Sequence, residues 1–131
     1  MANINSKTIK NVRDLIVYQT AFDAAMEIYR LTKAFPSEEK YSLTDQIRRS
    51  SRSVCSNLSE GWHKRQYIAA FVSKVADSMQ EASETQTWLD FSLALGYVTP
   101  KEYDELFGKY ETIISQLITM KQKAVTFCPK K

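Results

Sequence analysis

One pair of residues has the spacing of a metal site. Glu60 and His63 stand three positions apart, as Glu-x-x-His does in di-iron carboxylate bundles. Such a site needs a second motif of this kind and two further glutamates, but the chain has a single histidine. Gly61, a residue type that often ends a helix, stands between the two. The sequence therefore predicts neither a metal site nor a bound cofactor.

The other reactive side chains also lack the partners that catalysis needs. Cys55 lies between Val54 and Ser56, and we expect it to be a small packing residue because the sequence places no histidine to activate it. The three glycines are too far apart to form a phosphate-binding loop. Cys55 and Cys128 are too isolated for a disulfide framework or a zinc site. We therefore predict no catalytic residues and a protein that is not an enzyme.

A cluster of basic residues is the best candidate for a nucleic-acid-binding site. The cluster consists of Arg48, Arg52, Lys64 and Arg65. On a helix Arg48 and Arg52 share a face, whereas Arg49 is rotated by about 100° from Arg48. Two interpretations stay open: a solvated face with salt bridges to the acidic third helix, predicted over about 65–95, or a patch that binds RNA or DNA phosphates. The modest net charge of +3 does not identify a nucleic-acid binder.

A row of polar residues occupies another face of the same segment. Its members recur at three- and four-residue steps, which places them on one side of a helix. They are Gln46, Arg49, Ser53, Asn57 and Glu60. Buried Arg and Glu must be paired and hydrogen-bonded, and Ser78 and Glu81 further along the chain offer partners. We predict an inter-helix polar network that fixes register and assembly; the alternative is that the row faces solvent.

Four helices are expected to position these residues. Apolar residues recur at alternating three- and four-residue steps, which predicts helices over about 13–33, 42–60, 65–95 and 100–126. Ser42 with Asp45, and Thr99 with Glu102, have the spacing of capping boxes that begin a helix. Gly and Pro are scarce, so the connections are few and short. The predicted fold is all-α, an antiparallel up-down-up-down four-helix bundle that forms a single domain over 1–131.

Two of these helices carry more apolar surface than one bundle core uses. Segment 13–33 has one stripe from Leu15 to Tyr29 and a second from Val17 to Leu31. Segment 100–126 adds apolar residues beside its main stripe, namely Phe107, Ile114, Ile118 and Val125. A surplus apolar face usually packs against another molecule, and a second copy is the economical partner. We therefore expect a homo-oligomer; the alternative is a single bundle with a broad core that buries both stripes.

No targeting or membrane segment is found in the sequence. No apolar run approaches the roughly 18–20 residues that span a bilayer. The first ten residues are polar and lack the apolar stretch of a secretory signal. We expect a cytoplasmic protein that does not bind membranes.

The segment 46–61 resembles the signature of a known family. It reads QIRRSS at 46–51, SV at 53–54 and NLSEG at 57–61, and it is similar to the 23S ribosomal RNA intervening-sequence protein family, also called the four-helix-bundle protein family. The resemblance extends from about Leu15 to Leu117. It implies a four-helix bundle that assembles into a ring, usually a homopentamer. More distantly, the chain resembles the accessory protein of diversity-generating retroelements, a basic pentamer that works with a reverse transcriptase and nucleic acid.

Two functions are consistent with the sequence. The first is a non-catalytic, self-assembling four-helix-bundle protein that acts as a scaffold or protein-interaction module. The alternative is a homo-oligomer associated with RNA or DNA through its phosphates. The family is named after the position of some of its genes, and most of its members are of unknown function.

Overall fold

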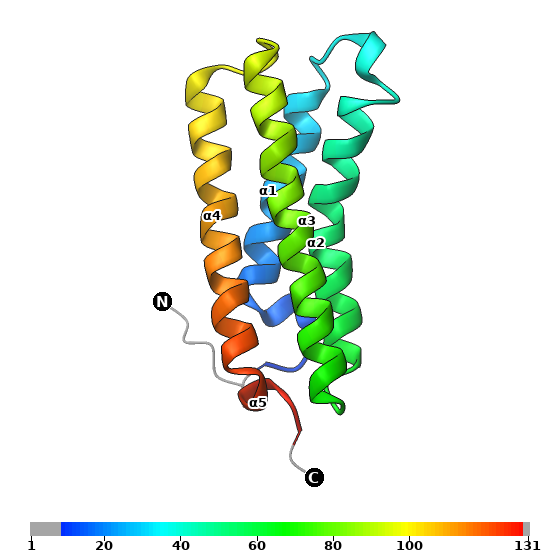
Figure 1. Cartoon of the computed structure of the whole chain (residues 1–131), viewed down its shortest axis with the longest axis vertical. Coiled ribbons are helices and arrows are strands. Elements are labelled where there is room, and N and C mark those ends of the chain that lie inside the picture. Colours follow the sequence, from blue (N-terminus) through cyan, green and yellow to red (C-terminus); the bar gives the residue numbers. More distant parts are fainter. Residues whose placement is uncertain (1–8, 130–131) are drawn as a thin grey trace.

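The computed structural model describes residues 9–129, which form an antiparallel four-helix bundle (Figure 1). Its long helices are α1 (Ile16–Thr32), α2 (Leu43–His63), α3 (Ile68–Ala94) and α4 (Pro100–Gln122). Two 3-10 turns, Val12–Asp14 and Ser37–Glu39, and the short helix α5 (Ala124–Phe127) complete the helical segments. Figure 1 shows consecutive long helices running in opposite directions. No strand occurs within residues 9–129, so the predicted fold class is confirmed.

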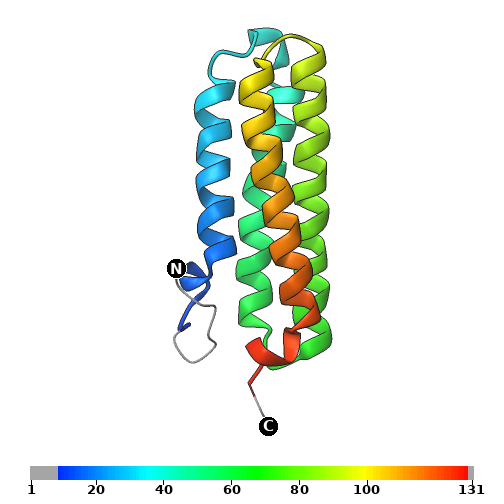
Figure 2. The same ribbon diagram turned by 90° about the vertical axis from the view of Figure 1, so that its left-hand side faces the viewer.

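The four helices pack as a square. α1 packs against α2 and α4, and α3 packs against the same two helices, as the two views in Figures 1 and 2 show. Helices α1 and α3 therefore occupy opposite corners. It follows that the surface shared by α1 and α2 and the surface shared by α3 and α4 lie on opposite sides of the molecule.

The core uses one apolar row from each long helix. These buried residues include Val17, Ala21, Ala24 and Ile28 of α1, Ile47, Val54 and Leu58 of α2, Phe71, Val75, Ala82 and Leu89 of α3, and Leu106, Tyr110, Ile113 and Leu117 of α4. On α1 the core row is thus the predicted stripe that begins at Val17. From the other predicted stripe, Leu15 is buried, whereas Phe22 is 49% exposed.

The predicted signals at the ends of α3 and α4 are confirmed. Thr99 accepts a hydrogen bond from the Glu102 backbone N–H (3.1 Å), and Glu102 accepts one from the Thr99 backbone N–H (2.8 Å). Both hydrogen bonds satisfy donors that a helix N-terminus leaves free. Gly96, just after α3, has a φ of +75°, a conformation that glycine adopts at low cost. The turn between α3 and α4 could therefore be predicted from the sequence.

The predicted capping box at Ser42 is wrong. The Ser42 hydroxyl makes no cap and instead donates to the Glu39 carboxylate (2.6 Å) in the preceding turn. The same carboxylate accepts a hydrogen bond from the Tyr97 hydroxyl (2.9 Å). The hydrogen bond from Ser42, followed by the one from Tyr97, lowers the pKa of Glu39. Glu39 therefore ties the α1–α2 turn to the turn that follows α3.

The predicted end of the second helix at Glu60 is also wrong. Helix α2 continues through Gly61 to His63. A Cβ atom at Gly61 would lie 2.9 Å from the Cβ atom of Lys74 on α3, closer than packed side chains approach. The glycine is therefore present because α2 and α3 touch there, and it does not end the helix.

Three further helix ends differ from the prediction. Leu15 has an extended backbone (φ −72°, ψ 128°), so α1 begins at Ile16 and not at residue 13. A turn follows α2, and α3 consequently begins at Ile68 and not at residue 65. Lys123 interrupts the last helix, which ends at Gln122 and is followed by α5. In each case the apolar periodicity of the sequence continues past the residue at which the helix begins or ends. The sequence pattern therefore does not mark these boundaries.

Candidate functional site

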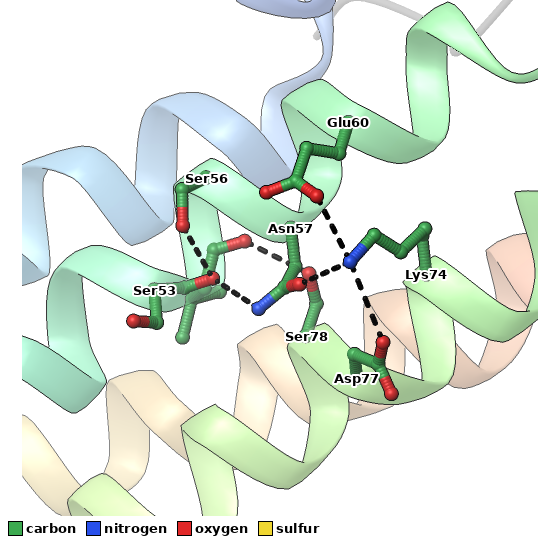
Figure 3. Close-up of polar contacts among 8 residues, drawn as sticks. Ser53, Ser56, Asn57, Glu60, Lys74, Asp77 and Ser78 are labelled. Atoms are coloured by element: carbon green, nitrogen blue, oxygen red, sulfur yellow. Dashed lines mark hydrogen bonds and ion pairs between the residues drawn. The ribbon is translucent and has the colours of Figure 1, made fainter.

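A polar seam joins α2 to α3, and Figure 3 shows the part of it around Lys74 and Ser78. The Lys74 ammonium on α3 lies 3.0 Å from the Glu60 carboxylate and donates to the Asn57 side-chain oxygen (3.1 Å). It also lies 3.6 Å from the Asp77 carboxylate. Asn57 in turn donates to the Ser53 carbonyl (2.9 Å). The hydrogen bond to Glu60 raises the pKa of Lys74, so this lysine is charged at neutral pH.

The inner part of the seam consists of buried hydroxyl groups. Ser78 donates to the Val54 carbonyl (2.8 Å), and the hydroxyls of Ser50 and Thr85 are hydrogen-bonded to each other (2.8 Å). Both bonds cross from one helix to the other. Since a buried polar group without a partner is costly, these pairings favour one register of α2 against α3 over its neighbours.

The structure brings together only part of the predicted network. Asn57, Glu60 and Ser78 lie in the seam with their side chains, whereas Ser53 contributes only its backbone carbonyl, which accepts from Asn57 of the same helix. Gln46 and Arg49 do not, because both are exposed: the Arg49 side chain is 74% accessible and lies 3.9 Å from Asp45 on its own helix. The prediction that Arg49 belongs to a buried network is therefore wrong.

Glu81 borders the seam as a half-buried carboxylate that makes no ion pair among residues 9–129. Burial, and then the negative charges of Glu84 and Asp77, raise the pKa of Glu81.

Lys74 holds the outer seam together and was missed by the sequence analysis. Lys74, Ser78 and Glu81 follow each other at four- and three-residue steps, a spacing that would have placed all three on one face of α3.

The predicted basic cluster is divided between two places. Arg48 of α2 lies against the last turn of α1, where it donates through Nε to the Thr32 hydroxyl (2.8 Å) and through Nη2 to the Tyr29 carbonyl (3.4 Å). Its guanidinium lies 4.7 Å from the centre of the Tyr29 ring. Arg52 lies 6.0 Å from the same ring centre. Arg48 thus anchors the last turn of α1 to α2 and is already engaged.

The other two basic residues lie beyond the far end of α2. Arg65 donates to the Trp62 carbonyl (2.9 Å) and stacks 3.6 Å from the centre of the Trp62 ring. Lys64 is exposed. The twelve positions from Arg52 to Lys64 correspond to about 18 Å of helix. Arg48, Arg52, Lys64 and Arg65 therefore do not form a single patch, contrary to the prediction.

Of the two neighbouring arginines, Arg48 contacts α1 and Arg49 lies in solvent. Arg48→Ala removes two hydrogen bonds and the contact with Tyr29, and we expect it to lower the free energy of unfolding by about 1–3 kcal/mol. Arg49→Ala removes a solvated side chain and should change it by at most about 0.5 kcal/mol. Denaturant unfolding of both variants checks this. Equal effects would show that the Arg48 contacts contribute nothing.

An open groove runs along the outer surface between α1 and α2. Its volume is about 610 Å³. It is lined by Tyr18, Phe22, Ala25, Met26 and Tyr29 of α1 and by Arg52, Cys55, Ser56, Ser59 and Glu60 of α2. Phe22 is 49% exposed and Met26 40% exposed. The surplus apolar stripe predicted on the first helix thus forms one wall of this groove, with Met26 as a member that the stripe did not include.

The Cys55 thiol and the Glu60 carboxylate line the groove. Cys55 lies at its floor, and burial raises the pKa of the thiol to about 12, so the thiolate is scarce at neutral pH. Glu60 holds Lys74, and His63 is exposed at the end of α2 without lining the groove. Within residues 9–129, no three His, Cys, Asp or Glu side chains lie close enough to hold a metal ion. The arrangement offers an apolar contact surface.

These features define a class of protein: an antiparallel four-helix bundle with a polar α2–α3 seam and an open apolar groove between α1 and α2. The chain belongs to the 23S rRNA-intervening sequence protein family, whose model matches residues 13–119. This match confirms the resemblance found in the sequence.

None of the helices in the part of the chain that the structure describes is long and apolar enough to cross a membrane.

A solved structure supports the same assignment. The chain is similar to the crystal structure of a protein of unknown function from the S23 ribosomal protein family of Bacteroides thetaiotaomicron VPI-5482. The two share 28% sequence identity with a TM-score of 0.74, over 82% of this chain and 99% of the other. No curated protein matches the chain.

Proposed function

We propose that this protein is a non-catalytic, self-assembling scaffold, and that the groove between α1 and α2 is a surface through which its copies associate. The observation that carries the proposal is the exposure of Phe22 and Met26 along an open groove. Leaving such apolar area in water costs about 25 cal/mol per Å². A contiguous exposed patch of this kind is typical of a surface that associates with another protein.

The shape and chemistry of the groove favour a helical protein partner. Its α1 wall presents Tyr18, Phe22 and Tyr29 at four- and seven-residue steps, a row that can pack against the apolar face of another helix. Its α2 wall is made mostly of small side chains, which allow a close approach. The protonated Cys55 thiol argues against nucleophilic catalysis at the same surface.

A closed homo-oligomer is the form of assembly that we propose, with five copies as the number. The number rests entirely on the family resemblance. Closed rings are a general solution for association between different surfaces of identical chains. Binding of RNA or DNA is the competing function, but the separation of Arg52 from Lys64 and Arg65 removes the contiguous basic patch on which it depended.

The test compares a groove variant with a surface control. Phe22→Glu combined with Met26→Glu places two charges in the groove, and both sites are exposed enough for the bundle to remain folded. We expect light scattering after size exclusion, at micromolar concentration, to give the mass of one 15.1 kDa chain for this variant and a larger mass for the wild type. Tyr41→Glu, at an 85% exposed position in the α1–α2 turn, should keep the wild-type mass.

Two results would contradict the proposal. One is a wild type that elutes as a single chain. The other is a groove variant that keeps the wild-type mass. Retained nucleic acid, measured by the ratio of absorbance at two ultraviolet wavelengths, would favour the competing function if it disappeared in an Arg52→Ala variant.

A further inference from the structure

We infer that the groove between α1 and α2 receives the α3–α4 surface of a second copy, so that the copies associate head to tail. This inference rests on the proposed function and specifies the partner surface. The partner is a second copy of this chain because the molecule carries a matching apolar surface on its opposite side.

The second surface is built on α4 and α3. Phe107, Glu111, Ile114 and Ile118 follow one another at four-, three- and four-residue steps, so they form one row on α4. Glu111 and the Phe107 carbonyl both accept hydrogen bonds from Gln86 of α3 (2.8 and 3.5 Å), which places this row beside the α3–α4 seam. Ile118 is 40% exposed. Three of the four surplus residues predicted for the last helix thus lie here.

The side chains on the α3 half of the surface are uncharged. Val72, Ala76, Met79 and Ser83 recur at four-, three- and four-residue steps, and all are at least partly exposed. The square packing of the helices puts this surface on the side of the molecule opposite to the groove. Association through two different surfaces is heterologous, and it closes into a ring when the rotation between copies is suitable. Pairing groove with groove would leave the second surface exposed.

The two surfaces carry opposite free charges. Arg52 in the groove makes no ion pair among residues 9–129. Glu111, on the other surface, accepts a hydrogen bond from a neutral amide and also makes no ion pair within that range. The carboxylate in the groove, Glu60, is neutralised by Lys74. When two copies associate, the unpaired Arg52 cation of one copy therefore meets the unpaired Glu111 carboxylate of the next. This charge complementarity fixes the orientation of the two copies.

The charges also lie at similar heights along the bundle. Lys109 of α4 pairs with Glu27 of α1, and because these helices are antiparallel, Glu111 lies level with Ala25. The Arg52 guanidinium is near Tyr29, which is about 6 Å along α1 from Ala25. Rotation about an axis parallel to the bundle preserves height. The long side chains of Arg52 and Glu111 can therefore meet between neighbouring copies.

A mixing experiment distinguishes head-to-tail from self-complementary contacts. The groove variant is Phe22→Glu with Met26→Glu, and the opposite-surface variant is Ala76→Glu with Ile118→Glu. We expect each to be a single 15.1 kDa chain alone, with helical content unchanged by circular dichroism. Each retains one intact surface, so an equimolar mixture should form a complex of two chains and no larger species.

The outcomes separate this inference from the proposed function. If the wild type assembles but the mixture stays monomeric, or if the opposite-surface variant keeps the wild-type mass, the inference is overturned and self-assembly stands. If the wild type is itself a monomer, the proposed function fails first. As a second test, Arg52→Glu and Glu111→Arg should each raise the dissociation constant at least tenfold, and the two together should restore it. No restoration would overturn the pairing.

Discussion

At neutral pH the Cys55 thiol is expected to react with iodoacetamide about a thousandfold more slowly than an ordinary cysteine. Burial at the floor of the groove raises its pKa from a reference of 9.0 to about 12. Only the thiolate reacts, and each pKa unit lowers its population tenfold. The rate should rise with pH until about pH 12. Mass spectrometry of the alkylated protein over time, in a Cys128→Ser background, gives the rate for Cys55 alone.

The same variant unfolded in urea is the control, because there Cys55 has the pKa of a solvated thiol. A folded-state rate within tenfold of the unfolded one would contradict the account. Alkylation of folded Cys55 that reaches half its maximal rate below pH 9 would contradict the account more strongly. It would mean that the groove activates the thiol, and the non-catalytic assignment would then lose its main chemical support.

Gly61→Ala is expected to lower the free energy of unfolding by about 1–3 kcal/mol, although alanine is the better helix former. The added Cβ would lie 2.9 Å from the Lys74 Cβ, so α2 and α3 must move apart where the polar seam holds them together. Because a Cβ atom is fixed to the backbone, Lys74 cannot avoid the contact by rotating its side chain. Urea unfolding followed by circular dichroism measures the change.

Gly108→Ala provides the matched control. Gly108 is also inside a long helix, but a Cβ there meets nothing within 4 Å. Alanine should therefore stabilise the protein by up to about 1 kcal/mol through helix propensity alone. Opposite signs for the two glycines are expected, and a stabilising Gly61→Ala would show that the close approach of α2 and α3 is not required.

The number and approximate position of the helices could be predicted because each buries a periodic apolar row. The sequence left open which of two adequate rows on the same helix enters the core. On α1, Ala21 and Ala24 allow close packing in the core, while the row with Tyr18 and Phe22 is left outside. That choice depends on the shapes of α2 and α4, which the sequence of α1 does not contain.

The site was predicted less well than the fold for a related reason. Spacing assigns polar residues to a face of α2, but it does not reveal which neighbouring helix that face meets. Arg48 and Arg49 differ by about 100° around the helix; one reaches Thr32 on α1 and the other remains in solvent. Gly61 shows the same limit, since a glycine that ends a helix and a glycine that lets two helices touch look alike in a sequence.

The central claim is self-assembly, and the mass of the wild-type particle tests it most directly. Native mass spectrometry at micromolar chain concentration, in a volatile buffer near neutral pH, counts the copies in one particle. The account predicts a single closed species of several 15.1 kDa chains, with five as the expected number. A spectrum that contains only the 15.1 kDa chain at these concentrations would contradict it.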